Sequence, residues 1–163
     1  MMASFDKIDS LLSRILLVLS GAAVLTLMLL ATANVVLRIF HAPFRGTYEI
    51  VSFLGAIGVA FALAATQRSK AHIIVDILSS RYSRRVKQRV DALSAAISAA
   101  FFGIVAWQVF AWGTQIMAAG EVSETLKTIY YPFVFGVAAG FGLLTLTCIL
   151  DITRAFRKAE EAP

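Results

Sequence analysis

An uncharged stretch in the first half of the chain limits what this protein can fold into. Residues 50–66 carry no charged side chain and are mostly apolar; Glu49 precedes them, and Gln67, Arg68 and Lys70 follow. A helix that crosses a bilayer needs roughly 17 to 25 such residues. The stretch therefore predicts a membrane-spanning helix, which we place at residues 48–67.

Three further apolar segments have the length of a spanning helix, and we place them at residues 15–37, 92–112 and 131–150. The composition agrees, because 59% of the residues are hydrophobic and only 15% are charged. The first segment is longer than the apolar region of a signal peptide, which has roughly 7 to 15 residues, so we expect it to remain in the mature protein. The sequence predicts an all-α integral membrane protein with one membrane domain over residues 1–163.

A shorter apolar segment lies between the second and third spans and is too short to cross a bilayer. Its apolar residues recur at helical spacing, and basic residues follow them: Ile73, Ile74, Ile77 and Leu78, then Arg81, Arg84 and Arg85. This pattern predicts an amphipathic helix at about residues 72–82 that lies in the membrane interface, with its apolar face among acyl chains. The arginines would contact anionic headgroups, which makes membrane lipids a predicted partner and the helix an anchor that holds the protein at one depth.

The basic residues predict the orientation of the spans. With both termini in the cytoplasm, the inside segments hold twelve Lys and Arg residues, and the outside keeps three, Arg38, Arg45 and Lys127. Cytoplasmic loops carry the excess of positive charge in multi-span proteins. We therefore expect both termini on the cytoplasmic side.

Two kinds of residue are candidates for holding the spans together. Arg38 ends the first span and Glu49 begins the second, one short turn later, so the two could form a structural ion pair at one membrane face. Small residues recur at close spacing within the spans and allow helices to approach closely. They are Gly55 and Gly58 in the second span, Ala95, Ala99 and Gly103 in the third, and Gly136 and Gly140 in the fourth.

The sequence offers no chemistry of its own. It has no nucleotide-binding loop, nucleophile elbow or paired-cysteine motif, and two histidines, His41 and His72, do not make a metal site. We therefore predict no enzymatic activity, no cofactor and no catalytic or metal-binding residue. The basic residues lie beside apolar segments, which favours membrane orientation over nucleic-acid binding. Every ionisable side chain is expected at a helix end or in a loop, whereas ion-coupled pumps place such groups within the membrane.

The chain resembles the small, Q-type (DctQ-like) membrane subunit of tripartite ATP-independent periplasmic (TRAP) transporters. The likeness rests on Arg38 closing the first span, Glu49 opening the second, Gly55 and Gly58 within it, and the segment RSKAHIIVDIL. His72 and Asp76 match the family's H-I-x-V-D pattern, and SETLKTIYYPFVFGVAAGFGLL is also similar. Where the family often has two acids at the start of the second span, this chain has Tyr48 and Glu49.

The resemblance implies a scaffold role in a sodium-coupled symport system in the bacterial inner membrane. A periplasmic substrate-binding protein would engage the complex transiently and deliver an organic acid, and a large membrane subunit would carry the acid across. This chain would pack beside that large subunit as an accessory scaffold. Two other hypotheses are an autonomous four-helix exporter, which would need an acid within a span, and a membrane assembly or sensor protein, which we would expect to have a sizeable soluble domain or a ligand-binding loop.

Overall fold

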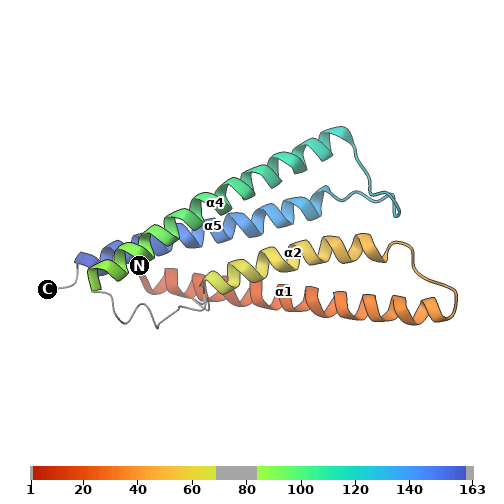
Figure 1. The fold of residues 1–163 in the computed structure, drawn as a ribbon, viewed down its shortest axis with the longest axis horizontal. Coiled ribbons are helices and arrows are strands. Elements are labelled where there is room, and N and C mark those ends of the chain that lie inside the picture. The colour runs from red at the N-terminus through yellow and green to blue at the C-terminus, as the bar shows by residue number, and fades with distance from the viewer. Residues whose placement is uncertain (1, 69–83, 161–163) are drawn as a thin grey trace.

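The computed structural model describes residues 2–68 and 84–160, and these segments form four helices (Figure 1). They are α1 (Met2–Ile39), α2 (Thr47–Arg68), α4 (Arg84–Ala119) and α5 (Tyr131–Glu160). Each contains a segment long and apolar enough to cross a membrane: Arg14–Ile39, Thr47–Gln67, Val90–Ala119 and Tyr131–Thr153. The all-α class and the four helices long and apolar enough to span a membrane are confirmed, while the predicted interfacial helix at residues 72–82 lies outside the described residues.

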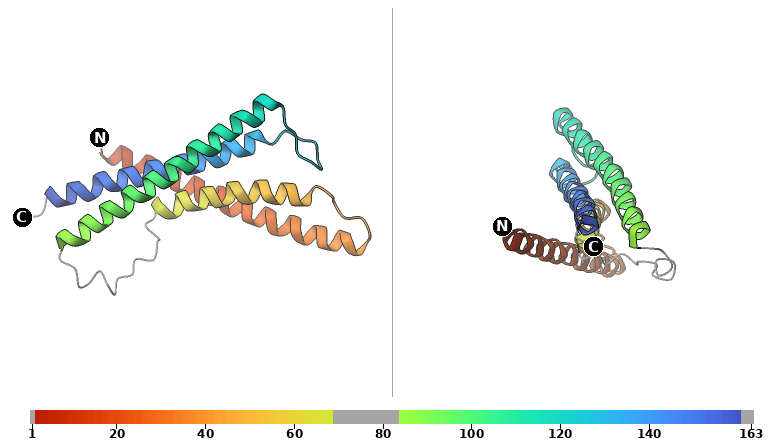
Figure 2. Two further views of the ribbon diagram at one scale, coloured as in Figure 1. Left: turned by 45° about the horizontal axis from the view of Figure 1, so that its top comes forward. Right: turned by 90° about the vertical axis from the view of Figure 1, so that its left-hand side faces the viewer.

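The four helices pack as a layer in the order α1, α2, α5, α4. Extensive contacts join α1 to α2, α2 to α5, and α5 to α4. Figure 1 shows this order, with α1 at one margin and α4 at the other, and in the right-hand view of Figure 2 α5 lies between α1 and α4. The arrangement therefore has two inner helices, α2 and α5, and two outer helices, α1 and α4, each of which has one extensively packed neighbour.

The loops and the chain termini lie at opposite ends of the layer. Residues 40–46 connect α1 to α2, and residues 120–130 connect α4 to α5; both loops lie at one end, which we call the loop end (Figure 1). The start of α1 and the end of α5 lie at the other, which we call the terminal end.

Both outer helices end in the same hydrogen-bonded turn. After α1, the N–H of His41 donates to Arg38 O at 3.1 Å and the N–H of Ala42 donates to Leu37 O at 3.0 Å. After α4, Gly120 donates to Met117 O and Glu121 to Ile116 O, at 3.3 and 3.1 Å. This pair of bonds defines a Schellman motif, which needs a left-handed residue after the helix. His41 and Gly120 fill that position, with φ of 56° and 65°.

The third span continues beyond its predicted end at residue 112. The helix that contains this span, α4, runs on to Ala119. The helix continues because Gly113 is buried against Phe135 and Val134 of α5, so it acts as a packing residue rather than a breaker. The left-handed Gly120 ends the helix instead.

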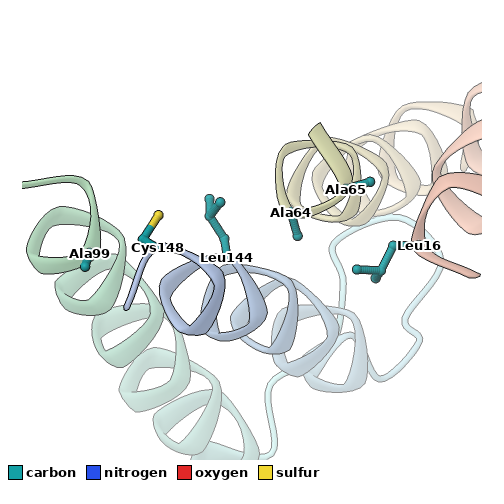
Figure 3. Packing of buried hydrophobic residues seen from close by; sticks show 6 residues of the cluster. All are labelled: Leu16, Ala64, Ala65, Ala99, Leu144 and Cys148. Atoms are coloured by element: carbon teal, nitrogen blue, oxygen red, sulfur yellow. The ribbon is translucent and has the colours of Figure 1, made fainter. Parts of the chain in front are cut away.

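The buried apolar cluster lies toward the terminal end and draws side chains from all four helices. Leu16 comes from α1, Ala64 and Ala65 from α2, Ala99 from α4, and Leu144 and Cys148 from α5 (Figure 3). Most of these side chains are small, so the helices approach closely and gain contact through van der Waals packing. Near this cluster, Gln67 Nε2 of α2 donates a hydrogen bond to Asp151 Oδ2 of α5 at 3.0 Å, which ties the two inner helices.

Candidate functional site

The predicted small residues lie at the contacts between neighbouring helices of this chain. Gly58 of α2 faces α1, where a Cβ would lie 3.3 Å from Ala23 Cβ. Gly55 also faces α1, with Leu27 Cδ1 at 3.9 Å from the corresponding position. Both glycines therefore serve the α1–α2 contact.

At the α2–α5 contact a glycine of one helix lies against the backbone of the other. A Cβ on Gly140 of α5 would lie 2.8 Å from Ala60 Cβ of α2 and 3.2 Å from the Ala60 carbonyl carbon. One turn earlier, Gly136 faces Ile57 Cδ1 at 3.3 Å. Backbone atoms cannot yield as a flexible side chain can, so Gly140 requires glycine.

The α4–α5 contact uses the predicted residues of α4 and one more. Ala99 is buried, Ala95 is half-buried, and Gly103 faces Thr145 Cγ2 at 3.4 Å. Gly113 continues this face and was not predicted, although its position ten residues after Gly103 keeps it on the same side of the helix. The small residues thus build the layer itself, so the surface for any partner must be sought elsewhere.

Glu49 joins the two halves of the layer at the loop end. Its carboxylate accepts two backbone hydrogen bonds from the loop 120–130, from Thr125 N–H to Oε1 at 2.5 Å and from Leu126 N–H to Oε2 at 3.1 Å. Hydrogen bonds to a charged acceptor are stronger than those between neutral groups. We call this arrangement the Glu49 clasp.

The predicted ion pair of Arg38 with Glu49 is not formed. Both oxygens of Glu49 face the loop 120–130, and Arg38 lies exposed in the last turn of α1. A cation at that position interacts favourably with the carbonyl end of the helix. Glu49 therefore does fasten helix ends, but its partner is a loop 76 residues away in the sequence, and no local pattern indicates such a contact.

The connection between α1 and α2 is fixed by its own hydrogen bonds. Asn34 Oδ1 accepts the N–H of Phe44 at 2.8 Å, and Thr47 Oγ1 donates to Phe44 O at 2.8 Å. Gly46 precedes α2 and contacts the side chain of Leu126, with no room for a Cβ. The loop 120–130 therefore rests on the start of α2 through Leu126 as well as through the Glu49 clasp.

The loop 120–130 folds back on itself before it enters α5. Val122 and Ile129 form an antiparallel bridge, and the N–H of Ser123 donates to Thr128 O at 2.9 Å. Tyr130 Oη donates to Glu121 Oε2 at 2.8 Å, and this hydrogen bond to a carboxylate raises the pKa of Tyr130 above its usual value. The phenol therefore stays protonated and remains a donor.

An aromatic stack adds a third contact at the loop end. The ring of Phe53 on α2 stacks with Tyr130 and with Phe133, with centroid distances of 5.7 and 5.2 Å and interplanar angles of 3° and 18°. Near-parallel rings at these separations are favourable beyond the area that they bury. Pro132 lies in the first turn of α5, where a missing N–H leaves no hydrogen bond unmade.

The predicted anchor residues Ile73, Ile74, Ile77, Leu78 and Arg81 lie outside the described residues. Arg84 and Arg85 begin α4. The anchor role of this segment stays a prediction.

One protein family matches most of the chain that the structure describes. Residues 27–158 match the model of the family described as tripartite ATP-independent periplasmic transporters, DctQ component. The chain belongs to the DctQ family. Neither a curated protein nor a solved structure matches the chain. The match covers the last third of α1, all of α2 and α4, and all of α5 but its last two residues.

Family membership makes the chain a multi-pass inner-membrane protein and a component of a multi-part transporter rather than of an enzyme family. A DctQ component acts with partner subunits, which need a surface on which to bind. The inner helices α2 and α5 are largely occupied by their neighbours, whereas α1 and α4 expose long apolar faces. The outer helices therefore expose most of the large apolar side chains of this DctQ protein.

Proposed function

We propose that this DctQ protein is a fixed scaffold subunit of a sodium-coupled secondary transporter that takes up an organic acid. A periplasmic binding protein delivers the acid in a transient encounter, and the large membrane subunit carries it across. This chain stays in place beside the large subunit. The family match over residues 27–158 is the observation that carries the proposal.

The distribution of charge along the spans favours a scaffold role. In each of the four spans, the acidic and basic residues lie within three residues of an end: Arg14 and Arg38, Glu49, Asp91 and Asp151. A coupled transport site within the membrane usually has an ionisable group in a cavity, where it binds the ion or proton. A chain whose spans carry such groups only at their ends fits a scaffold better than a transport pathway.

We further propose that the loop end faces the periplasm and both chain termini face the cytoplasm. The basic residues support this orientation, because twelve of fifteen fall on the predicted cytoplasmic side. Alkaline phosphatase and fluorescent-protein fusions after residues 44, 80 and 122 and at the C-terminus should report outside, inside, outside and inside. The reverse pattern would invert the proposed orientation.

Transport in reconstituted vesicles tests the scaffold function. The probe is a radiolabelled organic acid, selected because it raises the melting temperature of the purified binding protein. Vesicles with both membrane subunits, the binding protein and an inward sodium gradient should accumulate the acid, and a potassium gradient should not support uptake. Vesicles with this chain alone should take up none under either gradient. Uptake by the chain alone would show that it is a transporter in its own right.

A further inference from the structure

The outer face of α4 carries a polar residue where a bilayer offers no partner for it. This face, which we call the α4 outer face, is formed by Leu93, Ile97, Phe101, Ile104, Gln108 and Gln115. Their spacings of three, four and seven residues place them on one side of the helix. The opposite side holds Ala99, Gly103 and Gly113, which pack on α5.

Gln108 lies near the middle of the span. The segment Val90–Ala119 has its midpoint between residues 104 and 105, so Gln108 is about 5 Å from it along the axis at a rise of about 1.5 Å per residue. Its carboxamide cannot reach the headgroups from there, because the side chain is much shorter than the remaining distance. Gln115 is four residues from the end of the span and can reach the interface.

The Gln108 carboxamide is exposed and has no hydrogen-bond partner among the side chains and backbone groups that the structure describes. A carboxamide offers two donors and an acceptor, more than a helix backbone with its own bonds complete can satisfy. Leaving such a group in hydrocarbon is costly, and polar side chains in spans generally bond across helices instead. A second helix opposite Gln108 would supply hydrogen-bond partners for this carboxamide.

The outer face of α1 has no such requirement. Its centre is formed by Val18, Leu25, Leu29 and Val36, all exposed and all aliphatic. At the margin of this face, Thr26 Oγ1 bonds to Ala22 O of its own helix at 2.8 Å. Thr32 can make the same bond by rotating its hydroxyl side chain. Acyl chains alone can cover α1.

We propose that the α4 outer face binds a transmembrane helix of the large subunit, and that this helix places a hydrogen-bonding side chain opposite Gln108. The proposal rests on the proposed function, which supplies the large subunit as the partner. It assigns α1 to lipid and α4 to the protein interface, so the complex has a defined sidedness.

Photo-crosslinking from matched positions tests this sidedness. A benzophenone amino acid is placed at Ile104 of α4 or at Leu25 of α1, which are 64% and 63% exposed. The chain is co-expressed with the large subunit in membranes and irradiated. The variant at position 104 should give a product with the combined mass of the two subunits, and the variant at position 25 should not. A product from position 25 alone, or from neither position while the subunits still co-purify, would overturn the assignment to α4.

Two other outcomes are also informative. A product with twice the mass of this chain from position 104 would show that a second copy, not the large subunit, occupies the face. Subunits that do not co-purify at all, with or without the probe, would contradict the proposed function itself. The two failures are therefore distinguishable.

Substitution of the amide tests the polar contact. Gln108→Leu keeps the size and apolar character of the face and should weaken association with the large subunit by roughly 3- to 20-fold, the range for one hydrogen bond between spans. Thr26→Val on α1 removes a hydroxyl that bonds only to its own helix and should leave association unchanged. Equal association of Gln108→Leu and the parent chain, measured by titration of labelled subunits in nanodiscs, would contradict a role for the amide.

Discussion

The two outer helices, α1 and α4, occupy equivalent places in the layer but differ in the side chains that they expose to their surroundings. Each packs small residues against one inner helix and exposes a long apolar face on the other side. The exposed face of α1 is aliphatic at its centre, with a hydroxyl at its margin that bonds to its own backbone. The face of α4 carries a carboxamide at mid-depth.

This difference shows that exposure alone does not identify an interface in a membrane protein. Acyl chains cover apolar side chains as well as protein does, so an exposed Leu in a span carries no information about partners. A polar group at mid-depth does, because lipid cannot bond to it. The distinction between α1 and α4 therefore rests on the Gln108 side-chain amide. It also rests on the layer order, which places both helices at the margins.

A substitution at the α2–α5 contact should disturb the layer order most. Gly140→Leu drives a side chain into Ala60, including its backbone carbon, and overpacking of this kind costs about 1 to 3 kcal/mol or more. Gly21→Leu on α1 is the matched control, because nothing lies within 4 Å of a Cβ there. Unfolding by denaturant in mixed micelles should show a large decrease in the free energy of unfolding for the variant at position 140 only. Equal stability of the two variants would mean that α2 and α5 are not neighbours.

The Glu49 clasp links the α1–α2 half to the half that contains α4. Glu49→Gln removes the charge and one of two carboxylate acceptors for the Thr125 and Leu126 N–H groups, so the loop 120–130 should be held less firmly. Limited trypsin digestion after the exposed Lys127, followed by mass spectrometry, should become several-fold faster. Glu124→Gln in the same loop changes the same charge without touching the clasp. If both variants are cleaved at the same rate, the clasp does not hold the loop.

The ends of α1 and α4 offer the finest comparison, since the same turn is closed by different residues. A left-handed conformation costs a non-glycine residue about 1 to 2 kcal/mol, partly offset by the greater entropy that glycine loses on folding. His41→Gly should therefore raise the unfolding free energy by about 0.5 to 1 kcal/mol, and Gly120→Ala should lower it by a similar amount. A loss of stability in His41→Gly would indicate that the imidazole makes contacts that outweigh its backbone strain.

The sequence predicts the elements of this fold much better than their contacts. Long uncharged segments identify the four spans because a bilayer imposes length and apolarity directly. The helix that contains the third span runs past residue 112, because Gly113 packs on α5, and the local sequence does not reveal that contact. The partner of Glu49 was misassigned for a related reason: Arg38 is close in sequence, whereas Thr125 and Leu126 approach only once the layer is assembled.

The small residues show the same limit. Gly58, Gly103 and Gly140 lie against neighbouring helices, but the spacing of small residues does not say which helix approaches. In the fold, the chain's own helices fill these positions, and the surface that remains is distinguished by Gln108.

The central claim, that this chain is a scaffold that stays fixed against its partner, is tested most directly by transport after crosslinking. The complex is joined covalently through the photoreactive residue at position 104, purified and reconstituted with the binding protein, and sodium-driven uptake is compared with that of the same sample before irradiation. A fixed scaffold predicts the same initial rate per complex in the joined and unjoined samples. Loss of uptake on crosslinking would mean that the two surfaces move against each other during transport, and would contradict the scaffold role.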